Sequence, residues 1–345
     1  MSDKRPTISE IAALAGVSVA TVDRVLSDRA KVSHQTTVKV LGALRSLGMA
    51  GRLPPGARDS FRFNVILTLE DESFFERYQR AFQHWGASHG IVLRISRVAS
   101  DERQLPRLLA GLQKPGGRCH GLIVVGKNTP AMCEQMDGMA LAGIPTVLLL
   151  SPMDTAGGEY IGIDNYAAGR TAGYLLGAFL GGRGNALLLT HRLDFLSHEE
   201  RVRGFTDICA EKYPGIAIIG PLECHDTAAQ CQAAVAGQLA AGSELNGIYH
   251  TGAGSDGVAS ALAGREMMAW VAHELTPVNA ALLRQGAISA ILDQDVELQA
   301  ECAIEELLYR NGIIEQAAAG RLVPFHVMTP ENTSGMRRPQ TARQC

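Results

Sequence analysis

Side chains suited to binding a small polar molecule follow predicted β-strands at several points of this chain. They are Asp71, Ser73, Phe74 and Phe75 after the first strand, Asp101 after the second, residues 191–201 after a later strand, and then Ser255, His273, Glu274, Asp293 and Gln294. Guanidinium and amide groups donate hydrogen bonds and carboxylates accept them. Because open parallel sheets bind ligands beyond the carboxyl ends of their strands, we expect these residues to surround one crevice.

Glycine patterns typical of nucleotide-using enzymes are missing from the expected places. No Gly-x-Gly-x-x-Gly turn follows the first strand, and no Gly-x-x-x-x-Gly-Lys-Ser/Thr loop occurs. The glycines of residues 252–257 lie late in the chain, and their spacing alone is weak evidence for a nucleotide-binding turn. The sequence therefore predicts binding without chemistry, no catalytic residue and no cofactor, with an enzyme on a doubly wound sheet as the alternative.

The seven cysteines lie at scattered positions and predict neither disulfides nor a metal site. They are Cys119, Cys133, Cys209, Cys224, Cys231, Cys302 and Cys345, without Cys-x-x-Cys spacing. Cys224, His225, Asp226 and Cys231 form a conceivable zinc site, but zinc ligands usually come in tighter pairs. We expect ordinary thiols and no metal.

Composition indicates a water-soluble chain of two or three folding units. Of its 345 residues, 46% are hydrophobic and 19% charged. No segment approaches the ~18 uninterrupted apolar residues that would span a bilayer. The short polar start, residues 1–6, does not read as a signal peptide, so we expect a cytoplasmic protein without a membrane partner.

Most of the chain alternates short β-like runs with helical patterns. The runs are residues 64–67, 92–95, 121–125 and 146–150, and then residues 186–189, 216–219, 247–249, 268–271 and 290–292. Parallel strands need long crossovers and are buried on both faces, which this rhythm matches. We predict an α/β region of two lobes, each with a parallel doubly wound sheet.

The first 50 residues predict three short helices that form a helix-turn-helix module. Thr7 and Glu10 make a capping box, Gly16 ends the first helix and Ser18 caps the second. Ser33 caps the third. Ala12 supplies the small residue needed where the two helices of such a motif approach.

Charge and helical geometry point to DNA for this module. With Val22 inward, Val19, Ala20, Asp23 and Arg24 face outward at the start of the second helix. Residues 1–60 hold nine Lys and Arg against five Asp and Glu, a net +4. The chain has 32 basic and 35 acidic residues, so 23 and 30 remain beyond residue 60, a net −7. The alternative is a helical pair that merely packs.

Residues 7–49 resemble the headpiece of the LacI family of regulators. The shared pattern is Ile/Val-x-x-x-Ala-x-x-Ala-Gly-Val-Ser-x-x-Thr-Val-x-Arg-Val-Leu. The resemblance implies base contacts by Val19, Ala20 and Arg24 and phosphate contacts by Ser18 and Thr21. Further DNA-binding candidates are Thr7, Lys31 and Leu53. Asp23 stands where the family usually has Ser and adds a negative charge beside the groove.

The resemblance continues over residues 63–330, which look like the periplasmic sugar-binding fold of that family. Residues 200–205 match an Arg-x-x-Gly-Phe element whose arginine, here Arg201, reaches the ligand. Phe75 falls where an aromatic ring stacks on a sugar, and Glu274 and Gln294 fall on ligand positions. Ser255 replaces the more common Asn or Asp. Asp101 completes the set of effector-binding candidates.

Each of these residues has a structural alternative. The alternative for Arg201 is a surface charge on a helix. The alternative for Phe74 or Phe75 is packing in the core. His273 is better explained by a structural hydrogen bond than by titration. Asp164 and Asn165 begin a helix, so capping is their first explanation.

Four segments follow from these patterns. They are a DNA-binding headpiece over residues 1–50, a linker over 51–62, an effector-binding and dimerisation region over 63–333, and a polar tail over 334–345. The linker is rich in Pro and Gly. Leu53 acts there as a minor-groove wedge or the linker is a flexible tether, and the sequence favours the tether.

The resemblance implies a dimeric transcription regulator that acts as a repressor. Its partners would be palindromic operator DNA and a small effector, namely a monosaccharide, polyol or sugar acid. A helix-turn-helix dimer fits such an operator because its half-sites lie about one helical turn apart. The alternative from another class is a solute-binding protein that serves a transporter.

Overall fold

The computed structural model describes residues 7–27, 32, 34–47, 61–98, 104–112, 119–265, 268–311, 313–314, 316 and 322–333. The predicted contacts of Lys31, Leu53 and Asp101 lie outside the described residues, as do residues 51–60 of the linker and the polar tail.

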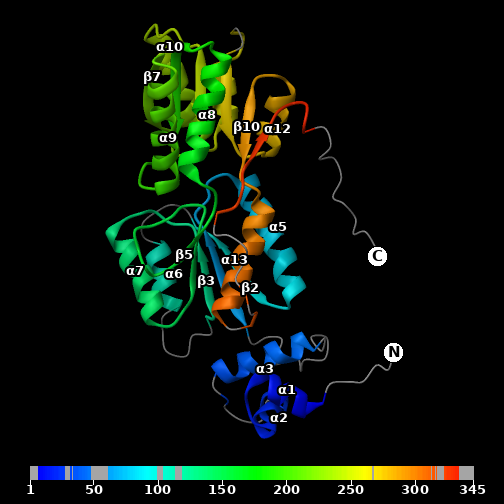
Figure 1. Cartoon of the computed structure of the whole chain (residues 1–345). Coiled ribbons are helices and arrows are strands. Elements are labelled where there is room, and N and C mark those ends of the chain that lie inside the picture. The colour runs from blue at the N-terminus through cyan, green and yellow to red at the C-terminus, as the bar shows by residue number, and fades with distance from the viewer. Residues whose placement is uncertain are drawn as a thin grey trace.

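Three helices stand at the start of the chain and pack on one another. They are α1 (Ile8–Ala15), α2 (Val19–Ser27) and α3 (His34–Ser46). The Thr7–Glu10 capping box starts α1, and Gly16 ends it with φ +64°, a left-handed conformation that glycine adopts without strain. In Figure 1 these helices lie beyond the first lobe, at the end opposite the second lobe.

The first lobe is built on a five-stranded parallel sheet in the order β2-β1-β3-β4-β5. Its elements are β1 (Arg62–Leu67), α5 (Glu72–His89), β2 (Val92–Arg97), α6 (Gln104–Leu112), β3 (Gly121–Val124), α7 (Pro130–Leu141), β4 (Thr146–Leu149), β5 (Glu159–Ile161) and the later helix α13 (Val296–Arg310). The last helix packs on α5, β3, β4 and β5.

The second lobe repeats this topology and adds one antiparallel edge strand, in the order β11-β10-β9-β8-β6-β7. Its elements are α8 (Asn165–Phe179), β6 (Arg183–Thr190), α9 (Leu196–Lys212), β7 (Gly215–Glu223), α10 (Ala228–Ala240), β8 (Gly247–His250), α11 (Ser255–Ala261), β9 (Ala269–His273), α12 (Pro277–Arg284), β10 (Ala290–Asp293) and β11 (His326–Met328).

The chain crosses between the lobes three times, and Figure 1 shows these crossings side by side at the centre of the molecule. It leaves the first lobe after β5, returns between β10 and α13, and leaves again before β11. A bridge between Gly162 and Leu322 joins two of the crossings. Both lobes thus present the carboxyl ends of their strands to this central region.

Apolar side chains cover both faces of each sheet. Val65 and Leu67 of β1 face the core against α5 and α13, whereas Ile66 faces the core against α6 and α7. The second sheet is divided in the same way. Within the described part of the chain, no helix combines the length and hydropathy that crossing a lipid bilayer requires.

The prediction of two α/β lobes with parallel sheets is confirmed. A strand occurs at each of the nine predicted runs, most of which are short apolar segments. The sequence missed β5 and β11, which are three residues long and lie at sheet edges. Such short segments carry too few residues to show a period.

Candidate functional site

A cavity of about 140 Å³ lies between the two lobes, beyond the carboxyl ends of their strands. Its first-lobe wall follows β1 and β3, on either side of the point where the strand order reverses. Its second-lobe wall follows β6 and β8, the equivalent point of the other sheet, together with β9 and β10. Two switch points therefore face each other, which is where open α/β sheets bind ligands.

Arg201 is the central charged residue of the cavity wall. The residue is only 3% exposed, which contradicts the surface-charge alternative. Its Nε donates to Asn165 Oδ1 at 2.9 Å and its Nη1 donates to the carbonyl of Thr251 at 2.8 Å. Among the described residues, Arg201 has no carboxylate within ion-pair distance. Two neutral acceptors therefore hold a cation whose remaining donors are available to a ligand.

Glycines bring the helix of Arg201 against its neighbour. A Cβ atom on Gly169 of α8 would lie 2.1 Å from the carbonyl oxygen of Arg201, and one on Gly204 of α9 would lie 2.1 Å from that of Tyr166. The two backbones therefore touch at both positions. This close approach places Asn165, next to the Asp164 cap of α8, within reach of the guanidinium.

Several buried polar atoms of the wall make no hydrogen bond within the described part of the chain. They are His191 Nδ1, Ser255 Oγ, His273 Nδ1, Glu274 Oε2 and Gln294 Oε1. Buried polar atoms are normally satisfied, so such a group of atoms on one cavity indicates a polar ligand or ordered water.

Glu274 and Gln294 lie side by side at the ends of β9 and β10. Gln294 Nε2 donates to Glu274 Oε1. Burial raises the pKa of Glu274 to about 7, and the nearby Arg201 opposes this shift. Near neutral pH the carboxyl group therefore exists in both protonation states, and it can donate or accept a hydrogen bond.

Two histidines of the cavity, His198 and His273, are held neutral. His273 Nε2 lies 2.9 Å from Tyr249 Oη, as a structural hydrogen bond requires, and His198 Nδ1 lies 2.9 Å from Thr251 Oγ1. Burial, with the nearby Arg201, places the pKa of both imidazoles well below the ordinary value. Each ring then offers one donor and one acceptor without adding charge.

Asp226 lines the cavity, although its sequence pattern suggested only a conceivable metal ligand. Its Oδ1 accepts from the backbone N–H of Ala253 at 2.9 Å, and its Oδ2 lies 3.4 Å from His191 Nδ1. Burial raises the pKa of this carboxyl group. The described residues contain no cluster of three or more His, Cys, Asp or Glu side chains arranged to hold a metal ion.

The structure places the predicted effector residues unequally. Arg201, Ser255, Glu274 and Gln294 all line the cavity. Phe75 does not line it, whereas its neighbour Phe74 does. Phe75 instead lies under the guanidinium of Arg97, 5.5 Å from the ring centre. Sequence reasoning could not separate the two rings, because the start of α5 decides which one faces inward.

The lobes also contact each other at the rim of the cavity. Lys127, after β3, lies 3.2 Å from Asp194 Oδ2 in the loop after β6. The N–H of Asn128 donates to the carbonyl of Asp194 at 2.7 Å. Although burial opposes it, pairing with Arg192 and Lys127 lowers the pKa of Asp194. The lobes are thus held together around the cavity.

A second candidate site lies on α2. Ser18, Val19, Ala20, Asp23 and Arg24 are exposed, while Val22 and Val25 of the same helix are buried. Ser18 Oγ accepts from the N–H of Thr21 at 3.2 Å and so caps the helix. Thr7 is exposed at the start of α1, where its side chain is engaged in the capping box. The residues that the sequence predicted to face outward on α2 are therefore the exposed ones.

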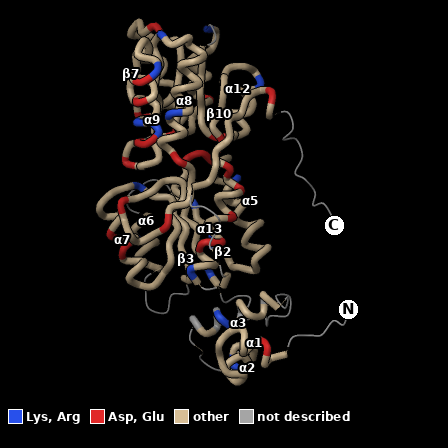
Figure 2. The backbone as a smooth tube through the Cα atoms, viewed as in Figure 1, with Lys and Arg blue, Asp and Glu red and all other residues tan. Residues whose placement is uncertain are grey.

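The cavity between the lobes and the exposed face of α2 differ in the charged residues that they present. Figure 2 marks several acidic positions where the lobes meet. Five of the residues that line the cavity are acidic, namely Glu70, Asp71, Asp226, Asp256 and Glu274. On the exposed face of α2, by contrast, Asp23 stands beside Arg24. The local field of each site, more than the total charge of −3, decides which charged partners it attracts.

Family models match the chain in two segments. The model described as "Periplasmic binding protein domain" matches residues 63–310, which is most of the chain. The chain belongs to this family. The model described as "Bacterial regulatory proteins, lacI family" matches residues 7–50, so the N-terminal segment is a lacI-family domain. The resemblance inferred from the sequence is confirmed.

Curated relatives of the chain are transcriptional regulators. It is 29% identical over 145 residues to the HTH-type transcriptional regulator GalR of Salmonella typhimurium, a match that covers 39% of this chain and 41% of the relative. It is 28% identical over 182 residues to the HTH-type transcriptional regulator CelR of Thermobifida fusca, covering 49% of this chain and 51% of the relative. The matches thus span about half or less of the relatives' length.

Solved structures share the two-lobed fold. A solute-binding protein of Burkholderia graminis in complex with D-arabinose matches with a TM-score of 0.75 at 20% identity, over 81% of this chain and 98% of that chain. A glucose-galactose binding protein, GanP, from Geobacillus stearothermophilus matches with a TM-score of 0.73 at 20% identity, over 80% and 99%. At such low identity these likenesses show the fold alone.

The raised pKa of Glu274 predicts a pH-dependent gain in stability for Glu274→Gln. The pKa of this carboxyl group is 4.5 ordinarily and about 7 in the folded protein. Burial of its charged form therefore costs no folding free energy below pH 4.5 and a growing amount as pH rises toward 7. Urea unfolding should show the variant more stable than the parent by up to about 3 kcal/mol at pH 8 and by much less at pH 5.

The exposed Glu134→Gln on α7 provides the control, since no burial cost attaches to that side chain. An equal gain at both pH values for Glu274→Gln would contradict the assigned environment of Glu274.

Proposed function

We propose that the chain is a sequence-specific DNA-binding transcription regulator whose affinity for its operator depends on a small polyhydroxylated ligand. The observation that carries the proposal is one chain that joins a lacI-family segment to a polar cavity between two lobes. The relatives GalR and CelR, named as transcriptional regulators, support a regulatory role without an enzymatic one.

The DNA contacts follow from the exposed face of α2. Val19, Ala20 and Arg24 reach base edges in the major groove, where a guanidinium reads guanine. Ser18 and Thr21 contact phosphates, and Thr7 at the start of α1 assists them. Lys31 and Leu53 remain proposals from the sequence. Recognition is of a palindrome by a homodimer, because one α2 reads only half a site of ordinary length.

The ligand chemistry follows from the cavity wall. Arg201 donates to oxygen, while Glu274 and Gln294 have oxygen atoms free to accept from hydroxyl groups. Phe74 offers the one aromatic face on the first-lobe wall. This alternation of donors, acceptors and one apolar surface suits a monosaccharide, a polyol or a sugar acid. D-arabinose is the ligand of one structural neighbour and myo-inositol of another.

Selection of bound fragments from the source genome tests the DNA half of the proposal. The purified chain should enrich one palindromic motif, and Arg24→Ala should lose or relax the preference at one base pair per half-site. A bidentate contact to a base contributes about 1–3 kcal/mol of discrimination.

Arg80→Ala removes an equally exposed arginine from α5 and should leave the motif unchanged. Failure to enrich any motif at moderate salt would count against DNA recognition and favour a solute-binding protein.

Thermal unfolding with added ligands tests the other half. The panel is D-arabinose, D-galactose, myo-inositol and D-galacturonate, and we expect at least one to raise the midpoint of unfolding. A ligand at a hundred times its dissociation constant stabilises the folded state by about 2.7 kcal/mol. Arg201→Met should abolish the shift, and Arg80→Met should not. No shift from any sugar, polyol or sugar acid would contradict the ligand proposal.

A further inference from the structure

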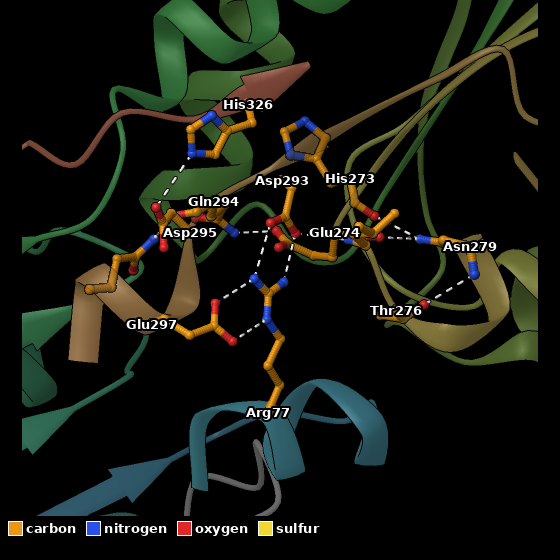
Figure 3. A network of polar contacts seen from close by, with 12 residues as sticks. Arg77, His273, Glu274, Thr276, Asn279, Asp293, Gln294, Asp295, Glu297 and His326 are labelled. Carbon is orange, nitrogen blue, oxygen red and sulfur yellow. Dashed lines mark hydrogen bonds and ion pairs between the residues drawn. The ribbon is translucent and has the colours of Figure 1, made fainter. Parts of the chain in front are cut away.

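Arg77 of α5 joins the two lobes beside the cavity (Figure 3). Its Nη1 and Nη2 donate to the two oxygens of Asp293, at 2.7 and 3.1 Å. Its Nε and Nη2 donate to the two oxygens of Glu297, at 3.0 and 2.6 Å. One guanidinium of the first lobe thus binds both the last residue of β10 and the first turn of α13, at the point where the chain crosses between lobes.

Asp293 passes this contact on to the ligand-facing side chains. Its Oδ1 also accepts from the N–H of Leu275 at 2.9 Å, so one carboxylate connects the ends of β9 and β10. The residue is 3% exposed. Glu274 immediately precedes Leu275, Gln294 immediately follows Asp293, and the two are hydrogen-bonded to each other. Figure 3 shows this pair next to the Arg77–Asp293 contact.

The next residue of α5 holds the same segment from its other side. Tyr78 Oη donates to Gln299 Oε1 at 2.9 Å, and Gln299 Nε2 donates to the carbonyl of Gln294 at 2.8 Å. Both Tyr78 and Gln299 are fully buried. Arg77 and Tyr78 therefore both fix the position of Gln294. Arg77 acts through Asp293, the residue before Gln294, and Tyr78 acts through Gln299, which bonds to the backbone carbonyl of Gln294.

The segments that Arg77 holds have unusual backbone conformations. Glu274 has φ +66° and Asp295 has φ +52°, both in the left-handed region that side chains other than glycine rarely adopt. Asn279 Nδ2 supports Glu274 by donating to its carbonyl at 2.8 Å. Strained positions of this kind persist only where surrounding contacts maintain them, and they are frequent at binding sites.

We propose that Arg77 is the positioning residue of the cavity, which through Asp293 holds Glu274 and Gln294 in place for a hydroxyl-bearing ligand. The proposal rests on the ligand function proposed above and adds a residue that does not itself line the cavity. The oxygens left without a partner, Glu274 Oε2 and Gln294 Oε1, are then the acceptors that Arg77 holds ready for the ligand. The same contact makes the ligand site depend on how the lobes are joined.

Three variants of the full chain test the proposal. Arg77→Met removes the charge and the hydrogen bonds, and Arg77→Lys keeps the charge but loses the bidentate contacts. Arg80→Met is the matched control, because Arg80 lies three residues further along α5 and, among the described residues, pairs with Glu76 alone at the surface. The probe for calorimetry is whichever of D-arabinose, D-galactose, myo-inositol and D-galacturonate the unaltered chain binds.

Arg77→Met should weaken probe binding by about tenfold or more, the size of effect that loss of an outer-shell partner has at metal sites. Arg77→Lys should bind the probe with an affinity between those of the parent and Arg77→Met, and Arg80→Met should bind it as the parent does. The pH profile of binding separates positioning from loss of structure. The charges that act on Glu274 are Arg201, Asp293 and Arg77, so losing Arg77 should move the profile to higher pH, and Arg77→Lys should not move it.

Hydrogen exchange of the ligand-free chain supplies a second readout. The amide of Leu275, bound to Asp293, should exchange faster in Arg77→Met and unchanged in Arg80→Met. Parent-like affinity and exchange in Arg77→Met would overturn the proposal, as would weakened binding with an unmoved pH profile. If the unaltered chain binds none of the four ligands of the panel, the ligand function fails, while unchanged exchange at Leu275 in Arg77→Met would still refute the role of Arg77.

Discussion

The burial of the Arg201 guanidinium between two lobes is the constraint on which the rest of the structure depends. Removing a cation from water is costly unless hydrogen bonds and charge compensate, and here Asn165 and a backbone carbonyl supply only neutral partners. Acidic groups share the cavity without pairing directly with Arg201, and burial raises the pKa of Asp226 and of Glu274. A polar ligand that bridges these groups would relieve that cost.

The elements of the fold were largely predictable because each expresses a local rule. Apolar runs such as residues 121–125 favour strands buried on both faces because they are too short for a typical helix, and Thr7 with Glu10 can begin a helix without help from distant residues. Glu274 and Gln294 were predictable because they directly follow strand ends, which all point to the same region, and Arg201 because it falls on the Arg-x-x-Gly-Phe element.

Contacts between distant segments were not predictable. The sequence does not show that Phe74 rather than Phe75 faces the cavity, that Asp226 reaches the N–H of Ala253, or that Arg77 meets Asp293, 216 residues away. Each depends on the angle between a helix and a sheet or between the lobes. In the sequence Arg77 is one of several charged residues of α5, and only the crossing of the chain beside it gives it a partner in the other lobe.

Reciprocity between the two sites tests the central claim most directly. If ligand binding in the cavity and DNA binding by α2 are coupled through the joined lobes, each ligand must change the affinity for the other by the same factor. Calorimetry should measure the affinity for the sugar with and without a saturating operator fragment, and the affinity for the fragment with and without the sugar. We predict two equal factors, different from one by about fivefold or more. Sugar affinity that is unchanged by the bound fragment would contradict the account.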